Sequence, residues 1–499
     1  WRMKTLYNNS EINSPYAGCI PIRIHLTQSW LPISMNASQA EIVAALSQIV
    51  GADKVKTDNE SLSIYGKDWT RVFDPKPSVI VFPTSIEHVQ EIVRYANAQK
   101  LALVPSGGRT GLSGGAMAIA GEVVVAFDKM NKILDFDPID QQVVCQPGVV
   151  TEVLQNFAAE QQLFYPVDFA SSGSSQIGGN VATNAGGIKV IKYGLTRDWI
   201  LGMKVVTGTG ELLELNKGLI KNATGYDLRH LFIGSEGTLG FIVELNIKLT
   251  TPPQDPMVLV LAVDAMESAV HVLQRFQAKL PLTAFEFFSE KALAHVIAEK
   301  GLQRPCETVG EFYALIEFEN ISEQTVDDAM AAFESCVEQG WALDGTLSQT
   351  SAQARDLWRL REDISETIAR FTPYKNDISV KVSKVPAFLH EVDEIVTRQY
   401  PDFEIIWFGH IGDGNVHLNI LKPEGLDKAL FFKQCSAVSV DIFECVQRFG
   451  GSVSAEHGVG LLKKPFLHYS RNKEELAYLK AIKNIFDPNG LMNPGKIFD

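Results

Sequence analysis

The chain has 499 residues, of which 45% are hydrophobic and 21% are charged, a composition typical of soluble globular proteins. This length is sufficient for about three domains. The formal net charge is −14 and no basic run offsets it, which argues against nucleic acid or an anionic membrane surface as the main partner. An anionic substrate would therefore need a local positive pocket.

The cysteine and hydropathy patterns predict a cytoplasmic protein. The 6 cysteines are scattered along the chain without a CxxC pair, which predicts reduced thiols and a cytoplasmic protein. No apolar run reaches the roughly 18 residues of a membrane span, and residues 257–263 are predicted to be a buried strand. We therefore expect no integral membrane contact. Residues 1–34 lack the features of a signal peptide, and we interpret them as an extension of unclear role.

The first predicted elements are two strands separated by a helix. Apolar residues between positions 42 and 50 have helical spacing, and residues 78–83 have the pattern of an apolar strand. Residues 84–93 are predicted to be a capped amphipathic helix, and residues 101–105 a second strand. This unit is typical of the start of an α/β domain.

Three glycine-rich loops follow between residues 105 and 240. The first, residues 106–115, has five glycines in ten residues, the second covers residues 171–187, and the third comprises residues 225–227 and 234–240. Such loops can leave backbone N–H groups exposed to the phosphates of a nucleotide. None of them is a Walker A loop or a complete G-x-G-x-x-G, so a nicotinamide site is not expected. Together they predict a long ligand held along its length by backbone.

The densest group of polar residues lies between positions 409 and 419. His410 and His417 flank a turn that contains Gly412 and Gly414, and these glycines allow the two imidazoles to converge. The alternation after the turn predicts a strand with His417 and Asn419 on one face.

Glu456 is the candidate third ligand, and His457 follows it directly. Two histidines and one carboxylate with an open position form a common catalytic site for a divalent metal, often zinc. The alternative is that the histidines are structural residues beside a glycine-rich turn.

Residues 105–108, 179–187 and 234–240 resemble the FAD-binding domain of the vanillyl-alcohol oxidase/PCMH superfamily. With residues 409–419 and 456–458 included, the chain from about residue 60 to its end resembles the FAD-linked D-2-hydroxyacid dehydrogenases.

The resemblance implies an α+β fold with three parts. These are a PCMH-type FAD-binding domain over residues 35–252, an α+β substrate- and metal-binding cap domain over residues 253–460, and a C-terminal segment, residues 461–499, that packs back on the FAD domain and closes the cleft. The second domain is also indicated by a predicted helix at residues 266–273 and by predicted strands at residues 285–288 and 312–318.

Some members of the superfamily attach FAD covalently through a histidine in the first loop. This chain has Arg109 and Thr110 there, so we expect a non-covalent FAD with its pyrophosphate on residues 106–111. The resemblance implies cofactor contacts from Pro105, Ser106, Gly107, Gly108, Arg109, Thr110, Gly111, Ser113, Gly178, Gly179, Asn180, Thr183, Asn184, Gly186, Gly187 and Gly237.

Within the family three substrates compete: D-2-hydroxyglutarate, D-lactate and glycolate. Residues 181–187 and 224–228 favour the first, because lactate and glycolate enzymes more often have Glu at the position of Thr183 and Ala before Gly225. D-malate also stays open.

A substrate with two carboxylates needs a second cationic anchor. Arg361 and Ser365 are predicted to share one face of a helix, with Lys375 downstream. These three positions match those that hold the distal carboxylate in 2-hydroxyglutarate dehydrogenases, and an Arg fork suits a carboxylate. The alternative for Arg361 is a solvated helix charge.

The resemblance also implies a mechanism. A zinc or other divalent metal at His410, His417 and Glu456 would lower the pKa of the substrate hydroxyl, and His457 would take its proton as general base. Asn419 would orient a carboxylate, and the hydride would pass from the substrate Cα to flavin N5. His457 as a mere support for the metal is the alternative.

The expected partners are a small D-2-hydroxy acid, an external electron acceptor such as a quinone or an electron-transfer flavoprotein, and a second copy of the chain in a homodimer. Two rival classes remain: a flavin-dependent transferase of the alkylglycerone-phosphate synthase type and a metal-dependent hydrolase.

Overall fold

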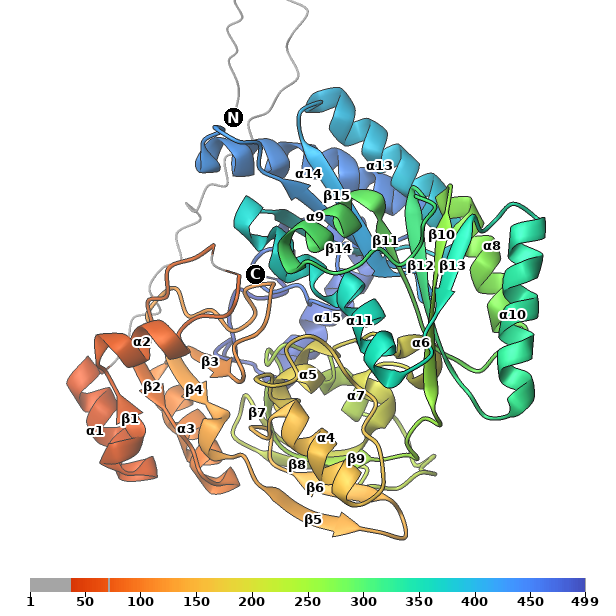
Figure 1. Ribbon diagram of the computed structural model, residues 1–499. Coiled ribbons are helices and arrows are strands. Elements are labelled where there is room, and N and C mark those ends of the chain that lie inside the picture. The colour runs from red at the N-terminus through yellow and green to blue at the C-terminus, as the bar shows by residue number, and fades with distance from the viewer. Residues whose placement is uncertain (1–36, 71, 499) are drawn as a thin grey trace, which may run out of the picture. The chain divides into compact units, whose positions relative to one another are not determined.

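The computed structural model describes residues 37–70 and 72–498 (Figure 1). All of them fall within one compact unit. The predicted extension at residues 1–34 and Cys19 lie outside the described residues. Within the described ranges, no helix combines the length and apolar character that crossing a membrane requires.

A four-stranded sheet, in the order β1-β2-β4-β3, begins the described chain. Strands β2, β4 and β3 are parallel, and β1 is antiparallel to β2. Its strands and the helices around it are β1 (Val55–Lys56), β2 (Val79–Val81), β3 (Leu103–Ser106), β4 (Val123–Ala126), α1 (Gln39–Val50), α2 (Asn59–Tyr65) and α3 (Ile86–Gln99). Apolar residues of α1 and α3 pack against β2 and β4, because helical spacing puts Ile42 and Leu46 on one side of α1 and Val89 and Val93 on one side of α3. The predicted strand–helix–strand unit is confirmed.

An antiparallel five-stranded sheet, in the order β5-β6-β9-β7-β8, follows. Its strands are β5 (Ile133–Asp137), β6 (Gln142–Cys145), β7 (Ile200–Thr207), β8 (Leu212–Leu215) and β9 (Gly240–Lys248), and the helices in this part are α4 (Thr151–Glu160), α5 (Ile177–Thr183), α6 (Val190–Tyr193) and α7 (Arg229–Phe232). The first glycine-rich loop leaves β3, the second contains α5, and the third leads into β9.

The rest of the chain is built on an antiparallel seven-stranded sheet in the order β13-β10-β12-β11-β15-β16-β14. Its strands are β10 (Pro256–Val263), β11 (Leu282–Ser289), β12 (Phe312–Glu319), β13 (Asp344–Leu347), β14 (Tyr374–Ser379), β15 (Glu404–His410) and β16 (Asn415–Leu421). The strands predicted within residues 257–263, 285–288 and 312–318 are confirmed.

Helices cover both faces of this sheet. Figure 1 shows α8 (Met266–Gln277) and α10 (Glu323–Glu338) on one side and α9 (Glu290–Lys300) and α11 (Ser351–Glu362) on the other. The first side is completed by α13 (Val385–Gln399) and α14 (Lys428–Phe449), whose apolar residues form one continuous core with alternate strand residues. The second side, with α12 (Ile364–Thr367), has a smaller apolar core and a group of buried polar residues.

The C-terminal residues return to the first sheet after α15 (Lys473–Phe486). The backbone N–H of Leu103 in β3 donates to the carbonyl of Leu491, and that of Asn493 donates to Leu103. A second link between the parts of the chain is the ion pair of Lys189, just before α6, with Glu317 of β12 at 2.8 Å.

Candidate active site

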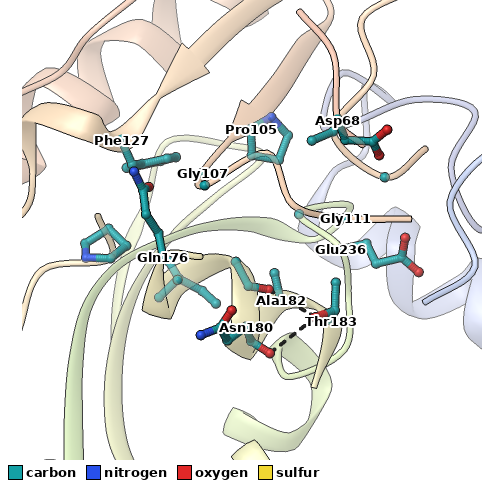
Figure 2. A pocket seen from close by; sticks show the side chains of 18 of the residues that line it. Asp68, Pro105, Gly107, Gly111, Phe127, Gln176, Asn180, Ala182, Thr183 and Glu236 are labelled. Carbon is teal, nitrogen blue, oxygen red and sulfur yellow. Dashed lines mark hydrogen bonds between the residues drawn. The ribbon is translucent and has the colours of Figure 1, made fainter. Parts of the chain in front are cut away.

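A pocket lies where the three glycine-rich loops meet (Figure 2). Most of the residues predicted to contact FAD line it, namely Pro105, Gly107, Gly108, Arg109, Thr110, Gly111, Ser113, Gly178, Gly179, Asn180, Thr183 and Gly237. Ser106, Asn184, Gly186 and Gly187 are not among the lining residues. The pocket is also lined by residues that were not predicted to contact FAD, among them Asp68 and Phe127, which lie outside the three loops, and Gln176 and Glu236, which lie within the second and third loops.

The lining of the pocket fits a flavin nucleotide. The Oδ2 atom of Asp68 and the Oε1 atom of Gln176 are buried acceptors without a hydrogen-bond partner, and the hydroxyls and N–H groups of FAD are donors of the kind they lack. A Cβ on Gly179 would meet no protein atom within 4 Å, so this glycine faces open space. Gly237, with φ +72°, lets its loop approach Pro105, whose Cγ would lie 2.5 Å from an added Cβ.

Arg109 holds the first loop together from within. Its backbone has φ 62°, and its guanidinium donates to the carbonyl of Gly107 and to both carboxylate oxygens of Asp128 at 3.1 and 3.0 Å. The guanidinium carbon also lies 4.6 Å from the ring centroid of Tyr65. Because these groups engage the guanidinium, the side chain stabilises the loop that bears the exposed backbone N–H groups.

The second group of predicted residues lies on the polar face of the seven-stranded sheet. Strand β15 ends at His410, a turn follows, and β16 carries His417, which pairs with Phe408 on one side and Asp377 of β14 on the other. Gly414 in the turn has φ +83°, and a Cβ there would lie 2.0 Å from a backbone carbonyl oxygen. The predicted turn and strand are confirmed, and the rings of His410 and His417 lie 5.3 Å apart.

Three histidines converge on one carboxylate oxygen. Glu456 Oε1 lies 3.9 Å from Nε2 of His410, 3.7 Å from Nε2 of His417 and 3.6 Å from Nε2 of His457. Burial and the charge on His410 lower the pKa of His417 well below its ordinary value, so this imidazole is neutral and offers a lone pair. Nitrogen and carboxylate donors this close together suit a divalent metal such as zinc.

Asp377 lies in the same cluster but holds the backbone. Its Oδ2 atom accepts the N–H groups of Ala455, Glu456 and His457 at 3.0, 2.9 and 2.9 Å, and its Oδ1 atom accepts from Asn415 Nδ2 at 2.8 Å. Burial alone would raise the pKa of Asp377, but the two nearby imidazoles and these backbone donors lower it below its usual range. Ligand atoms of Asp377, His417, Glu456 and His457 lie within 4.8 Å of one another, but a carboxylate with four donors is a poor metal ligand.

Glu286 is a buried residue that sequence analysis missed. Its Oε1 atom accepts from His410 Nδ1 at 2.7 Å, and its Oε2 atom lies 2.8 Å from Nη2 of Arg361. A neutral His410 therefore carries its proton on Nδ1 and directs the lone pair of Nε2 toward Glu456. Burial would lower the pKa of His410, but the Glu286 and Glu456 carboxylates raise it to about 9, so a metal ion entering the cluster would displace a proton.

Arg361 is buried beside this cluster. Arg361 and Ser365, which were predicted to share one helix, lie on two consecutive helices, because α11 ends at Glu362 and α12 begins at Ile364. Arg361 is only 6% exposed and its guanidinium lies over the ring of Phe408, so it is not a solvated helix charge. Its Nε atom is buried without a hydrogen-bond partner, which leaves a donor for an anion.

The remaining predicted substrate residues lie on or beside the polar face of the seven-stranded sheet. Ser365 is half-buried on α12. Lys375 of β14 is exposed and pairs across the sheet with Asn419, which is buried.

The flavin pocket and the histidine cluster adjoin each other. A Cβ on Gly186, in the second glycine-rich loop, would lie 3.2 Å from Oε2 of Glu456. Glu236, which lines the pocket, accepts the backbone N–H groups of Val459 and Gly460 at 2.7 and 2.8 Å. The two sites therefore share one wall.

Comparison with known proteins identifies the family. Residues 77–216 match a family model described as FAD binding domain, and residues 252–497 match one described as FAD linked oxidases, C-terminal domain. A D-2-hydroxyglutarate dehydrogenase of Stutzerimonas stutzeri is 62% identical over 92% of this chain and 98% of its own length. The chain belongs to the FAD-linked D-2-hydroxyacid dehydrogenases.

Other relatives in this family carry two kinds of name. A D-2-hydroxyglutarate dehydrogenase of Xanthomonas citri is 52% identical over 92% of this chain and 97% of its own length. A protein of Schizosaccharomyces pombe named putative D-lactate dehydrogenase, mitochondrial, is 36% identical over 90% of this chain and 87% of its own.

The fold of this D-2-hydroxyacid dehydrogenase family member matches solved structures of the superfamily. The p-cresol methylhydroxylase structure aligns with a TM-score of 0.73 at 17% identity, covering 94% of this chain and 99% of that one. This match confirms the predicted PCMH-type fold. The family models and the relatives described above confirm the predicted FAD-dependent dehydrogenase.

Proposed function

We propose that this enzyme oxidises D-2-hydroxyglutarate to 2-oxoglutarate with a divalent metal, zinc in the first instance, held by His410, His417 and Glu456. The observation that carries the proposal is the convergence of imidazole Nε2 atoms on Glu456 Oε1 beside the buried, unpaired Nε of Arg361. The relatives named D-2-hydroxyglutarate dehydrogenase support the choice of substrate.

The metal would act as a Lewis acid that lowers the pKa of the substrate hydroxyl, and FAD would accept the hydride at N5. The residues of the chain bind and orient the acid. His457, 26% exposed at its side chain, takes the hydroxyl proton at Nε2, and its Nδ1 lies 3.8 Å from the Asp377 carboxylate, which stabilises the imidazolium that results.

Two sets of polar groups would hold the two carboxylates. Asn419 and the metal site take the carboxylate next to the hydroxyl. Arg361, with Ser365 and Lys375, takes the distal one, because an Nε donor in a buried site has no other partner. A substrate with one carboxylate leaves this donor unpaired, which costs roughly 1–3 kcal/mol.

The electron acceptor is external, such as a quinone or an electron-transfer flavoprotein, and the chain works as a homodimer in the cytoplasm. Cys145, Cys306, Cys336, Cys435 and Cys445 are free and buried, which suits a reducing compartment. D-lactate is the second candidate substrate, since the relative from Schizosaccharomyces pombe bears that name.

Anaerobic bleaching of the flavin absorbance tests the proposal. D-2-hydroxyglutarate, D-lactate, D-malate and glycolate are compared before and after chelation with EDTA. We expect rapid bleaching by D-2-hydroxyglutarate, its loss after chelation, and its return with added Zn²⁺. Bleaching by D-lactate or glycolate alone would reject the two-carboxylate substrate, and bleaching that survives complete chelation would reject the metal.

A further inference from the structure

Glu236 occupies a position between the flavin pocket and the segment that carries Glu456 and His457. It is 5% exposed, its backbone has φ 51°, and it is one of the residues that line the pocket. Figure 2 shows it on the same side of the pocket as Asp68. Its carboxylate accepts the N–H groups of Val459 and Gly460. One residue thus lines the flavin pocket and also binds the segment that carries Glu456 and His457.

The segment from residue 455 to residue 460 is held at its two ends by two carboxylates, one from β14 of the seven-stranded sheet and one from the third glycine-rich loop. Asp377 of the seven-stranded sheet accepts the N–H groups of residues 455–457, as described above. Glu236 accepts those of residues 459 and 460. Fixing both ends of so short a segment restricts where Glu456 and His457 can lie.

The segment also packs directly on the flavin loops. A Cβ on Gly458 would lie 3.1 Å from Glu236 Cδ, and one on Gly460 would lie 2.3 Å from the carbonyl oxygen of Ser113, which lines the pocket. These contacts leave no room for the segment to shift toward the pocket without moving its wall.

The backbone of Glu236 is itself tied to the flavin loops. Its N–H donates to the carbonyl of Ala182 at 2.7 Å, and its carbonyl accepts from Asn493 Nδ2 at 2.6 Å. The same amide of Asn493 donates to the carbonyl of Gly115 at 2.8 Å. Ala182 and Gly115 also line the pocket. A ligand bound there would therefore restrain the groups that fix the backbone of Glu236.

We propose that Glu236 is a positioning residue that couples FAD binding to metal binding, an inference that rests on the metal site of the proposed function. When FAD fills the pocket, Glu236 is fixed, Val459 and Gly460 are held, and Glu456 stays in place for the metal. When the pocket is empty, the segment loosens and the metal binds less tightly. By thermodynamic linkage, the metal must tighten FAD binding by the same factor.

Calorimetric titration of Zn²⁺ into FAD-loaded and FAD-depleted protein tests this coupling. We expect Zn²⁺ to bind the FAD-loaded wild type at least about 10-fold more tightly, within the 10- to 100-fold range typical of groups that support metal ligands. In Glu236→Gln the ratio should fall to about 2-fold or less, because each carboxylate oxygen accepts one N–H group and an amide nitrogen replaces one of these oxygens.

Three further variants make the result specific. Glu122→Gln removes a comparably buried carboxylate, which accepts the Ala120 N–H, and should keep the wild-type ratio. Glu236→Asp keeps a carboxylate at a left-handed backbone position that Asp tolerates, and should retain a ratio above that of the Gln variant even if the latter folds poorly. His417→Ala identifies the Zn²⁺ bound at the proposed site.

A Glu236→Gln protein with the wild-type ratio would overturn the coupling while leaving the metal site intact. If His417→Ala instead binds Zn²⁺ as tightly as the wild type does, both the metal site and the coupling are overturned.

Discussion

The two faces of the seven-stranded sheet carry opposite kinds of residue on the same strands. Along β16, Val416, Leu418 and Ile420 are buried in the apolar core under α13 and α14, whereas His417 and Asn419 face the polar side. A strand alternates its side chains between two faces, so one segment can supply both a core and a site. The apolar face therefore contributes most of the stability, and the proposed active-site residues lie on the other face.

Removing a residue of the polar face should affect the reaction most. We expect His417→Ala to slow anaerobic flavin reduction by D-2-hydroxyglutarate at least about 1,000-fold, because a Lewis acid is worth several kcal/mol. The free energy of unfolding should change by no more than about 1 kcal/mol, since a buried polar ring contributes little net stability. Stopped-flow spectroscopy and urea denaturation measure the two quantities.

The neighbouring residue should give the reverse pattern. Leu418→Ala is expected to lower the free energy of unfolding by roughly 2–5 kcal/mol, because Leu418 is fully buried and its loss leaves a cavity. Flavin reduction per folded molecule should change little. A Leu418→Ala protein that folds normally but reduces flavin poorly would refute the separation of the two faces.

The buried support of His410 should have an intermediate effect. Glu286→Gln replaces one carboxylate oxygen with an amide nitrogen, so that the hydrogen bond from His410 Nδ1 is weakened and Arg361 loses its ion-pair partner. We expect Zn²⁺ to bind about 10- to 100-fold more weakly, the usual cost of losing such a support. A competition titration with a chelator would show this, and an unchanged affinity would mean that Glu286 does not orient the ligand.

The smallest expected effect is a pH dependence of the free energy of unfolding, and it arises from Glu236, which lies between the two sites. The pKa of Glu236 is raised from 4.5 to about 7, chiefly by burial; the two backbone N–H groups and Lys496 oppose this rise, and Asp68 adds to it. The folded protein therefore keeps a proton that the unfolded chain has lost, and this stabilisation is fully present below pH 4.5 and disappears as pH rises through 7.

Between pH 6 and pH 8 the wild type should therefore lose roughly 1 kcal/mol of unfolding free energy relative to Glu236→Gln, which cannot titrate. Urea denaturation of both proteins across this range measures the difference. A constant difference would mean that Glu236 is ionised throughout.

The sequence predicted the local features well. Helical and strand periodicities near residues 42–50, 78–105 and 312–318 reflect burial on one side of an element, which the pattern of apolar residues records directly. The glycine-rich loops and the turn between His410 and His417 were predictable because few residues other than glycine allow such backbone.

The supports of the site were beyond sequence reasoning. Glu286 stands in an apolar strand, where an isolated carboxylate is a visible signal, but its partner His410 is 124 positions away. The same holds for Glu236 and its contacts 223 and 224 positions away. The break between α11 and α12 also carries no proline or glycine to announce it. Such features depend on long-range packing, which one sequence does not display.

The most direct test of the account is the ratio of flavin-reduction rate constants for D-2-hydroxyglutarate and D-lactate, measured in wild type and in Arg361→Met. Arg359→Met serves as control, because Arg359 lies on the same helix but is half-exposed and pairs with Asp363. We expect the ratio to fall by at least about 10-fold in Arg361→Met, because the distal carboxylate loses its buried donor, and to stay unchanged in the control. An equal loss with both acids would contradict the assignment of Arg361 to the distal carboxylate.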